Sequence, residues 1–242
     1  MSYGQLPYDI AHLLGGGVLL LSFVLLYQRR ITAVINAFAV QGALVAAAAV
    51  WQGVAQDAAG LFLTAIIAFG AKAVAIPLVL RAMLRRLDLM NGAPDPDLRA
   101  VQSSGRRTLG REVETALGIG PSMIAGVGLV ALAILVVLPA TAGTHALARE
   151  DLALSLSVVL LGMLMMISRR NAISQVIGLM SLENGLLLAA IGAAGMPLVV
   201  ELSTAALVLV LAIVAAVIAL QMRQRLQSLD THALQDHRGE QG

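Results

Sequence analysis

Two ionisable side chains lie near the middle of apolar runs of this sequence. Lys72 is the only lysine of the chain and lies within a run from about 58 to 80, and Glu183 lies about twelve positions into a run that begins near 171. Runs of this length are typical of membrane-spanning helices, in which a central charge costs about 2.5–3.5 kcal/mol unless it meets a partner or water. We therefore predict Lys72 and Glu183 to be ion-translocation residues.

The residues beside these two charges fit such a role. Pro77 follows Lys72 by five residues and can loosen the helix, which leaves a carbonyl able to solvate a cation. Asn184 supplies a hydrogen-bonding group next to Glu183, and nearby glycines leave room for a close helix or for water. A second interpretation stays open for both charges, namely a buried ion pair or hydrogen bond that only fixes helix packing. Whether the two charges lie on one path is also open.

Three further ionisable residues are weaker candidates. Asp9 and His12 stand one helical turn apart at the start of the first apolar run, where they form an interfacial pair or an ion entrance. Glu201 follows Pro197 by one turn, and we expect the N-terminus of a helix to stabilise its charge.

The residue types that the chain lacks limit its chemistry. It has no cysteine, so it cannot hold an iron–sulfur cluster or a thiolate metal site. His12 is the only histidine inside a predicted span, which excludes a haem held by two histidines of this chain. The sole lysine has no phosphate-binding loop around it. We expect no cofactor, no metal and no active site of the chain's own.

The composition predicts an integral membrane protein that is all-α. Hydrophobic residues make up 59% of the chain, charged residues 12%, and the mean hydropathy is +0.87. The two-residue alternation of barrel strands is absent, so helices must satisfy the backbone in lipid. We predict seven transmembrane helices, at about 9–28, 31–52, 58–84, 118–138, 151–168, 171–194 and 198–222. Small residues in the second of them, Gly42 and Ala43, Ala46, Ala47 and Ala49, predict a close packing surface.

The arginines predict the orientation of these helices. They follow the first, third, fifth and seventh predicted spans, whereas the other connections carry only Arg149. The positive-inside rule then places the N-terminus outside and the C-terminus in the cytoplasm. The chain is thus expected to comprise three helices in 1–84, a cytoplasmic loop or surface helix in 85–117, four helices in 118–222 and a cytoplasmic tail in 223–242.

A set of short motifs resembles the hydrogenase-4 component E family from about the third span to residue 234. The motifs are Ser168-Arg169-Arg170-Asn171, Ile177-Gly178, Glu183-Asn184-Gly185, Lys72 with Pro77, and Leu229-Asp230. That family is related in its C-terminal half, here about 151–222, to the K-type subunit of respiratory complex I and to the C subunit of multisubunit sodium/proton antiporters. Two places differ from the K-type pattern: Met180 occupies the position of the usual acid, and the apolar stretch 205–209 occupies that of a second acid.

The resemblance implies a non-redox subunit of a multisubunit, energy-converting hydrogenase-like oxidoreductase in a prokaryotic inner membrane. Its partners would be antiporter-like membrane subunits and a peripheral oxidoreductase arm that holds the iron–sulfur clusters and the metal centre. Lys72 and Glu183 would contribute to proton or sodium translocation, with Pro77, Arg169, Arg170, Asn171 and Asn184 as the supporting motif. Two alternatives are a purely structural scaffold subunit of such a complex and a stand-alone permease for small solutes.

Overall fold

The protein is a bundle of helices in the part of the chain that the computed structural model describes, residues 6–91, 118–141 and 146–192. Six helical segments there are long and apolar enough to cross a membrane, and all regular elements of these residues are helices. The protein is therefore a multi-pass helical membrane protein. The predicted seventh span at 198–222, Glu201, the tail 223–242 and most of the expected loop 85–117 lie outside the described residues.

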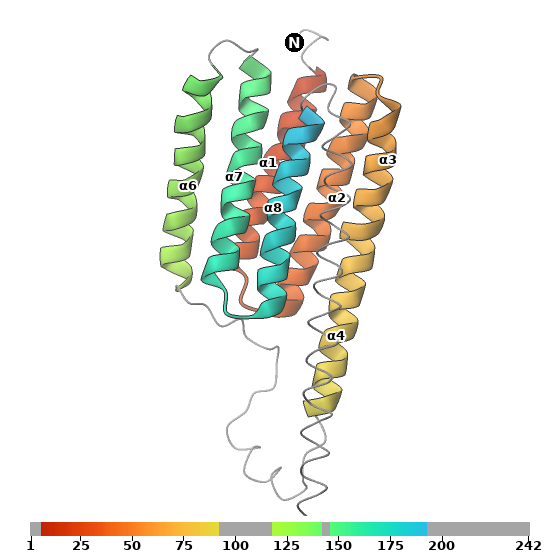
Figure 1. Ribbon diagram of the computed structural model, residues 1–242, viewed down its shortest axis with the longest axis vertical. Coiled ribbons are helices and arrows are strands. Elements are labelled where there is room, and N and C mark those ends of the chain that lie inside the picture. Colours follow the sequence, from red (N-terminus) through yellow and green to blue (C-terminus); the bar gives the residue numbers. More distant parts are fainter. Residues whose placement is uncertain (1–5, 92–117, 142–145, 193–242) are drawn as a thin grey trace, which may run out of the picture. The chain divides into compact units, whose positions relative to one another are not determined.

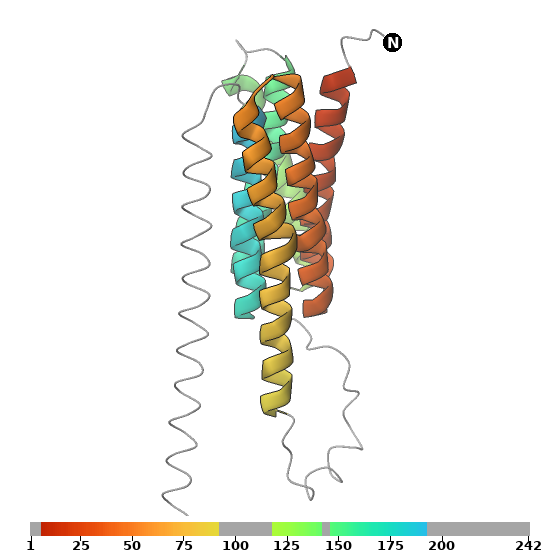
Figure 2. The ribbon, with the colours of Figure 1, turned by 90° about the vertical axis from the view of Figure 1, so that its right-hand side faces the viewer.

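The helices follow the predicted spans closely. They are α1 (Leu6–Tyr27), α2 (Ile31–Ala55), α3 (Ala59–Ala68), the π-helical segment η1 (Phe69–Ala75), α4 (Ile76–Asn91), α6 (Ile119–Ala140), α7 (Ala146–Ser168) and α8 (Ala172–Gly192). Figure 2 shows that α3, η1 and α4 form one continuous rod. This rod continues to Asn91, beyond the expected end at 84, because residues with good helix propensity follow the apolar part.

Four helices form the centre of the bundle. The helices α1, α2, α8 and α7 contact one another in that cyclic order, α6 packs on α7, and the rod of α3, η1 and α4 packs on α2 (Figure 1). The rod thus reaches the rest of the bundle mainly through α2. Buried residues are most frequent in α8 and α2 and least frequent in α6, which exposes most of its apolar side chains.

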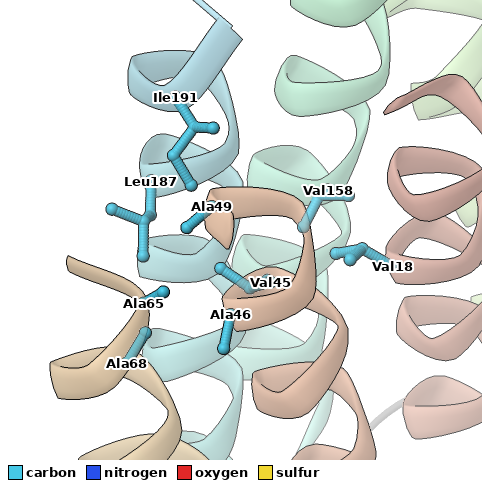
Figure 3. Packing of buried hydrophobic residues seen from close by; sticks show 9 residues of the cluster. All are labelled: Val18, Val45, Ala46, Ala49, Ala65, Ala68, Val158, Leu187 and Ile191. Carbon is cyan, nitrogen blue, oxygen red and sulfur yellow. The ribbon is translucent and has the colours of Figure 1, made fainter. Parts of the chain in front are cut away.

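The core near the end of α8 is made of small and branched apolar side chains from five helices. Figure 3 shows Val18 of α1, Val158 of α7, and the other members of this cluster, Val45, Ala46, Ala49, Ala65, Ala68, Leu187 and Ile191. The alanines allow α2 and α3 to approach closely, as the small residues of the second span predict. Two alanines of the prediction are exceptions: Ala47 lies exposed on the opposite side of α2, and Ala43 is half-buried and lies outside this cluster.

Helices α7 and α8 are in backbone contact at three glycines. A Cβ atom added to Gly162 would lie 2.5 Å from the backbone nitrogen of Leu182, and one added to Gly178 would lie 3.1 Å from the carbonyl oxygen of Gly162. At Gly185 it would lie 2.8 Å from the backbone nitrogen of Val159. Since such contacts leave no space for any side chain, these glycines fix the separation of α7 and α8.

We predict that Gly162→Ala destabilises the bundle, because the added methyl group meets rigid backbone and forces the two helices apart, at a cost of about 1–3 kcal/mol. Thermal unfolding in mild detergent should show a lower midpoint temperature. Gly128→Ala in α6 is the matched control, since a Cβ atom there meets nothing within 4 Å. Equal midpoints for the two variants would contradict the close packing of α7 on α8.

Candidate functional site

Lys72 and Glu183, which the sequence singled out separately, form an ion pair inside the bundle. The Nζ atom of Lys72 lies 3.2 Å from Oε1 of Glu183, and the exposed fractions of the two side chains are 3% and 7%. Lys72 comes from η1 and Glu183 from α8. The pairing places an acid and a base within proton-transfer distance in a region shielded from the surroundings of the protein.

The backbone around Lys72 is a π-helix. The N–H group of Ile76 donates to the carbonyl of Ala71, five residues earlier. The next bond of this series would join Pro77 to the carbonyl of Lys72, and proline has no N–H group to donate. The disturbance that the sequence leads us to expect from Pro77 thus takes the form of a widened turn at Lys72. Such π segments occur frequently at functional sites.

This π-helical segment packs against a glycine of α2. A Cβ atom on Gly42 would lie 2.9 Å from Cβ and 3.0 Å from the backbone carbon of Lys72. Because only hydrogen occupies that space, η1 lies directly on the backbone of α2. The close approach brings the Lys72 side chain within reach of α8, which also packs on α2.

A buried hydrogen-bond network lies beside the ion pair and joins three helices. The amide nitrogen of Gln41 on α2 donates to the hydroxyl of Ser22 on α1 at 2.9 Å and to that of Ser181 on α8 at 3.0 Å. It also lies 3.4 Å from the carbonyl of Val18, to which Ser22 donates at 3.0 Å. The amide nitrogen of Asn184 donates to Oε1 of Gln41 at 3.2 Å.

Sequence reasoning identified Asn184 but missed Gln41, Ser22 and Ser181. Gln41 is fully buried, and it stands near the centre of the apolar second span. A polar amide at that depth is the signal that could have found the network, because such a group requires hydrogen-bond partners within the membrane. The two serines carry no such signal, since a serine can satisfy its hydroxyl on its own helix.

Arg169 has a structural role that the sequence did not predict. The arginine pattern indicates a topology signal near the membrane surface, whereas the side chain is buried and donates from Nη2 to the carbonyls of Leu25 and Leu26. The last carbonyls of a helix lack partners within the helix and carry partial negative charge, so a buried guanidinium caps α1 well. Arg170, the next residue, is exposed.

Asn171 shapes the turn that follows. Its side-chain oxygen accepts a hydrogen bond of 2.9 Å from the backbone N–H group of Ile173, which caps the N-terminus of α8. Gln175 closes the same turn by donating to the carbonyl of Arg169 at 2.9 Å. The motif from Ser168 to Asn171 is therefore the tight turn between α7 and α8, and it sets the start of α8.

His12 pairs with acids of α7, which corrects the predicted partnership with Asp9. Its Nδ1 lies 3.1 Å from Oδ1 of Asp151, and its Nε2 lies 3.4 Å from Oε2 of Glu150. The prediction considered only neighbours on the same helix, whereas packing of α1 on α7 brings these two carboxylates closer. This cluster is separate from the ion pair. Ser22 belongs to the network beside the ion pair, and His12 precedes Ser22 by about 15 Å along the axis of α1.

No set of three or more histidine, aspartate or glutamate side chains within residues 6–91, 118–141 and 146–192 is arranged to hold a metal ion. The chemistry available to the ion pair is proton exchange between a carboxylate and an ammonium group, with the amide and hydroxyl groups of the network beside them.

Comparison with known proteins adds one relative. The chain is 25% identical over 224 residues to the uncharacterized protein Rv0085 of Mycobacterium tuberculosis, and the match covers 92% of this chain and 93% of that protein. No protein-family model matches the chain. No solved structure matches it.

We predict that Lys72 and Glu183 are energetically coupled. Lys72→Met or Glu183→Gln alone should lower the unfolding temperature in detergent, because each leaves a buried polar group without its opposite charge. The double variant should lose less than the sum of the single losses, with a coupling free energy of about 0.5–3 kcal/mol. Thermal unfolding of the four proteins measures this coupling, and additive losses would contradict the pairing.

Proposed function

We propose that this chain is a non-redox membrane subunit of a multisubunit, energy-converting hydrogenase-like oxidoreductase related to complex I. In this proposal Lys72 and Glu183 contribute to proton or sodium translocation through the membrane. The observation that carries the proposal is the buried ion pair itself, formed by an acid and a base from two membrane-spanning segments. Ionisable residues inside membrane helices are associated with ion pathways.

Packing alone is a weak reason for such a pair. Replacing a buried ion pair by apolar residues of similar volume often leaves stability unchanged or raises it. An ion pair can, however, respond to the arrival of a proton, which apolar residues cannot do. A proton that arrives at Glu183 neutralises the carboxylate and removes its attraction for the ammonium group of Lys72. The ammonium group of Lys72 must then find another acceptor or lose its own proton. Protonation of Glu183 therefore promotes deprotonation of Lys72.

The resemblance of the motifs to the hydrogenase-4 component E family supports the same proposal. Met180 takes the place of the usual K-type acid, and it is buried on α8 three residues before Glu183. Positions three residues apart lie on neighbouring parts of one helical face, so Glu183 can serve in place of that acid. The proposed partners are antiporter-like subunits and a peripheral arm with iron–sulfur clusters and a metal centre.

The proposal includes a membrane arrangement. A seventh span at 198–222, an N-terminus outside and a C-terminus in the cytoplasm of a prokaryote account for the distribution of arginines along the chain. The apolar side chains exposed along α6, among them Ile124, Val127 and Leu135, suit contact with lipid or with neighbouring membrane subunits.

A structural scaffold is the alternative that a specific observation favours. The three glycine contacts between α7 and α8 make a tight unit that needs no ion relay. A scaffold and a relay differ in their response to a change of charge that preserves shape. A scaffold keeps its normal ion translocation per assembled complex after that change, and a relay does not.

We predict that Glu183→Gln leaves the complex assembled and reduces ion translocation several-fold, because an amide does not take up or release a proton near neutral pH. The complex is purified from native membranes through a tag on this chain, its subunits are identified by mass spectrometry, and ion uptake per turnover is measured in liposomes. Glu150→Gln is the matched control, since the side chain of Glu150 is 60% exposed.

Each outcome has a distinct meaning. Normal assembly with normal translocation in Glu183→Gln would refute the relay and leave the scaffold. Recovery of the chain alone, folded and without partner subunits, would refute the complex and favour a stand-alone permease, which uptake by the purified chain in liposomes would then test.

A further inference from the structure

Gln41 is the most highly connected polar side chain of the described bundle core. It is fully buried on α2 and contacts α1 through Val18 and Ser22 and α8 through Ser181 and Asn184. Both ends of its amide are engaged, since Oε1 accepts from one helix while Nε2 donates to two. The orientation of the amide is therefore fixed by its partners. Few competing partners exist for such groups inside a membrane bundle.

The two α8 partners of Gln41 fix the rotation of that helix. Ser181 and Asn184 are three residues apart, so they lie about 60° from each other around the helix axis. A helix held at two neighbouring points of one face has little freedom to turn about its axis. Glu183 lies between these two residues in the sequence and about 100° around the axis from Asn184. The direction in which Glu183 points is thus set by the bonds to Gln41.

The next residue of α2 fixes the other partner of the ion pair. Gly42 is in contact with the backbone of Lys72, because a Cβ atom there would lie 3.0 Å from the backbone carbon of Lys72. Two successive residues of α2 therefore locate the two charges: Gln41 holds α8, and Gly42 holds η1. The rod and α8 both pack on α2, which makes α2 the common reference for the pair.

We infer that Gln41 is a positioning residue, which holds Glu183 in line with Lys72 through its hydrogen bonds to Ser181 and Asn184. An amide does not titrate near neutral pH, so Gln41 does not itself exchange protons. It acts through the geometry of the ion pair. Its effect on ion translocation rests on the proposed function, whereas its effect on the pairing of Lys72 with Glu183 does not.

The test asks whether Gln41 is needed for the coupling of the two charges. The unfolding temperatures of the parent chain, Lys72→Met, Glu183→Gln and the double variant are compared with and without Gln41→Met. Methionine has a similar length and flexibility and no hydrogen-bonding amide. We expect the non-additivity of the two charge variants to fall to less than half when Gln41 is replaced. A purely structural effect would lower all four temperatures and leave the non-additivity unchanged, which would overturn the inference.

Gln52→Met is the matched control on the same helix. Gln52 accepts a hydrogen bond from Gln56 at 3.1 Å, and that contact lies outside the network of Gln41. The coupling of Lys72 and Glu183 should survive in this background. Loss of the coupling in the Gln52 variant as well would overturn a specific role for Gln41. If Gln41→Met does not accumulate in the membrane, Ser181→Ala takes its place, because it removes one of the hydrogen bonds between Gln41 and α8. A coupling of Lys72 and Glu183 that Ser181→Ala leaves unchanged would likewise overturn the inference.

A second readout links the inference to the proposed function. In the purified complex, Gln41→Met should reduce translocation, and it should cause no further reduction when Glu183→Gln is already present. An additional loss in that background would show that Gln41 acts independently of Glu183 and would overturn the inference. If Glu183→Gln itself translocates normally, the proposed function fails, and the unfolding experiment still decides the role of Gln41.

Discussion

A charge buried inside a membrane-spanning bundle is costly unless it meets an opposite charge, backbone carbonyls or water, and for Lys72 and Glu183 the opposite charge meets this need. The ammonium and carboxylate groups lie 3.2 Å apart, and the segments that carry them, η1 and α8, both pack on α2. Their meeting depends on a widened turn at Lys72 and on a glycine that removes bulk between η1 and α2. The cost of burying the two charges is thus offset by features of the backbone as well as by their attraction.

Helix α2 and the pair of α7 and α8 supply the frame for this contact. Gln41 and Gly42 provide successive fixed points on α2, one for each charged partner. The glycines of α7 and α8 hold those helices at backbone contact, which fixes the distance between α7 and α8. Hydrogen bonds and small residues thus hold the helices together jointly. This is usual in a membrane, where no hydrophobic force drives helices to associate.

The two ends of the bundle are tied by different polar contacts. Arg169 closes the C-terminus of α1 from the turn between α7 and α8, so one buried cation joins three helices. His12 links the other end of α1 to the acids Glu150 and Asp151 of α7. Both of its ring nitrogens face a carboxylate, and both contacts are hydrogen bonds only when the imidazole carries two protons. Each end of α1 is therefore held on α7 or its flanking turn.

The sequence by itself determined the helical membrane class, the approximate bounds of six spans, and the placement of Lys72 and Glu183 inside two of those spans. Each of these follows from local rules, because the length of an apolar run and the cost of a charge within it depend only on nearby residues. The tertiary structure decided which residues meet: Lys72 with Glu183, Arg169 with the end of α1, and His12 with α7 instead of Asp9. These contacts join helices far apart in the chain, and side-chain spacing along one helix carries no information about the rotation of its neighbour. Gln41 shows the limit most clearly, since its partners lie on α1 and α8 and only packing brings them together.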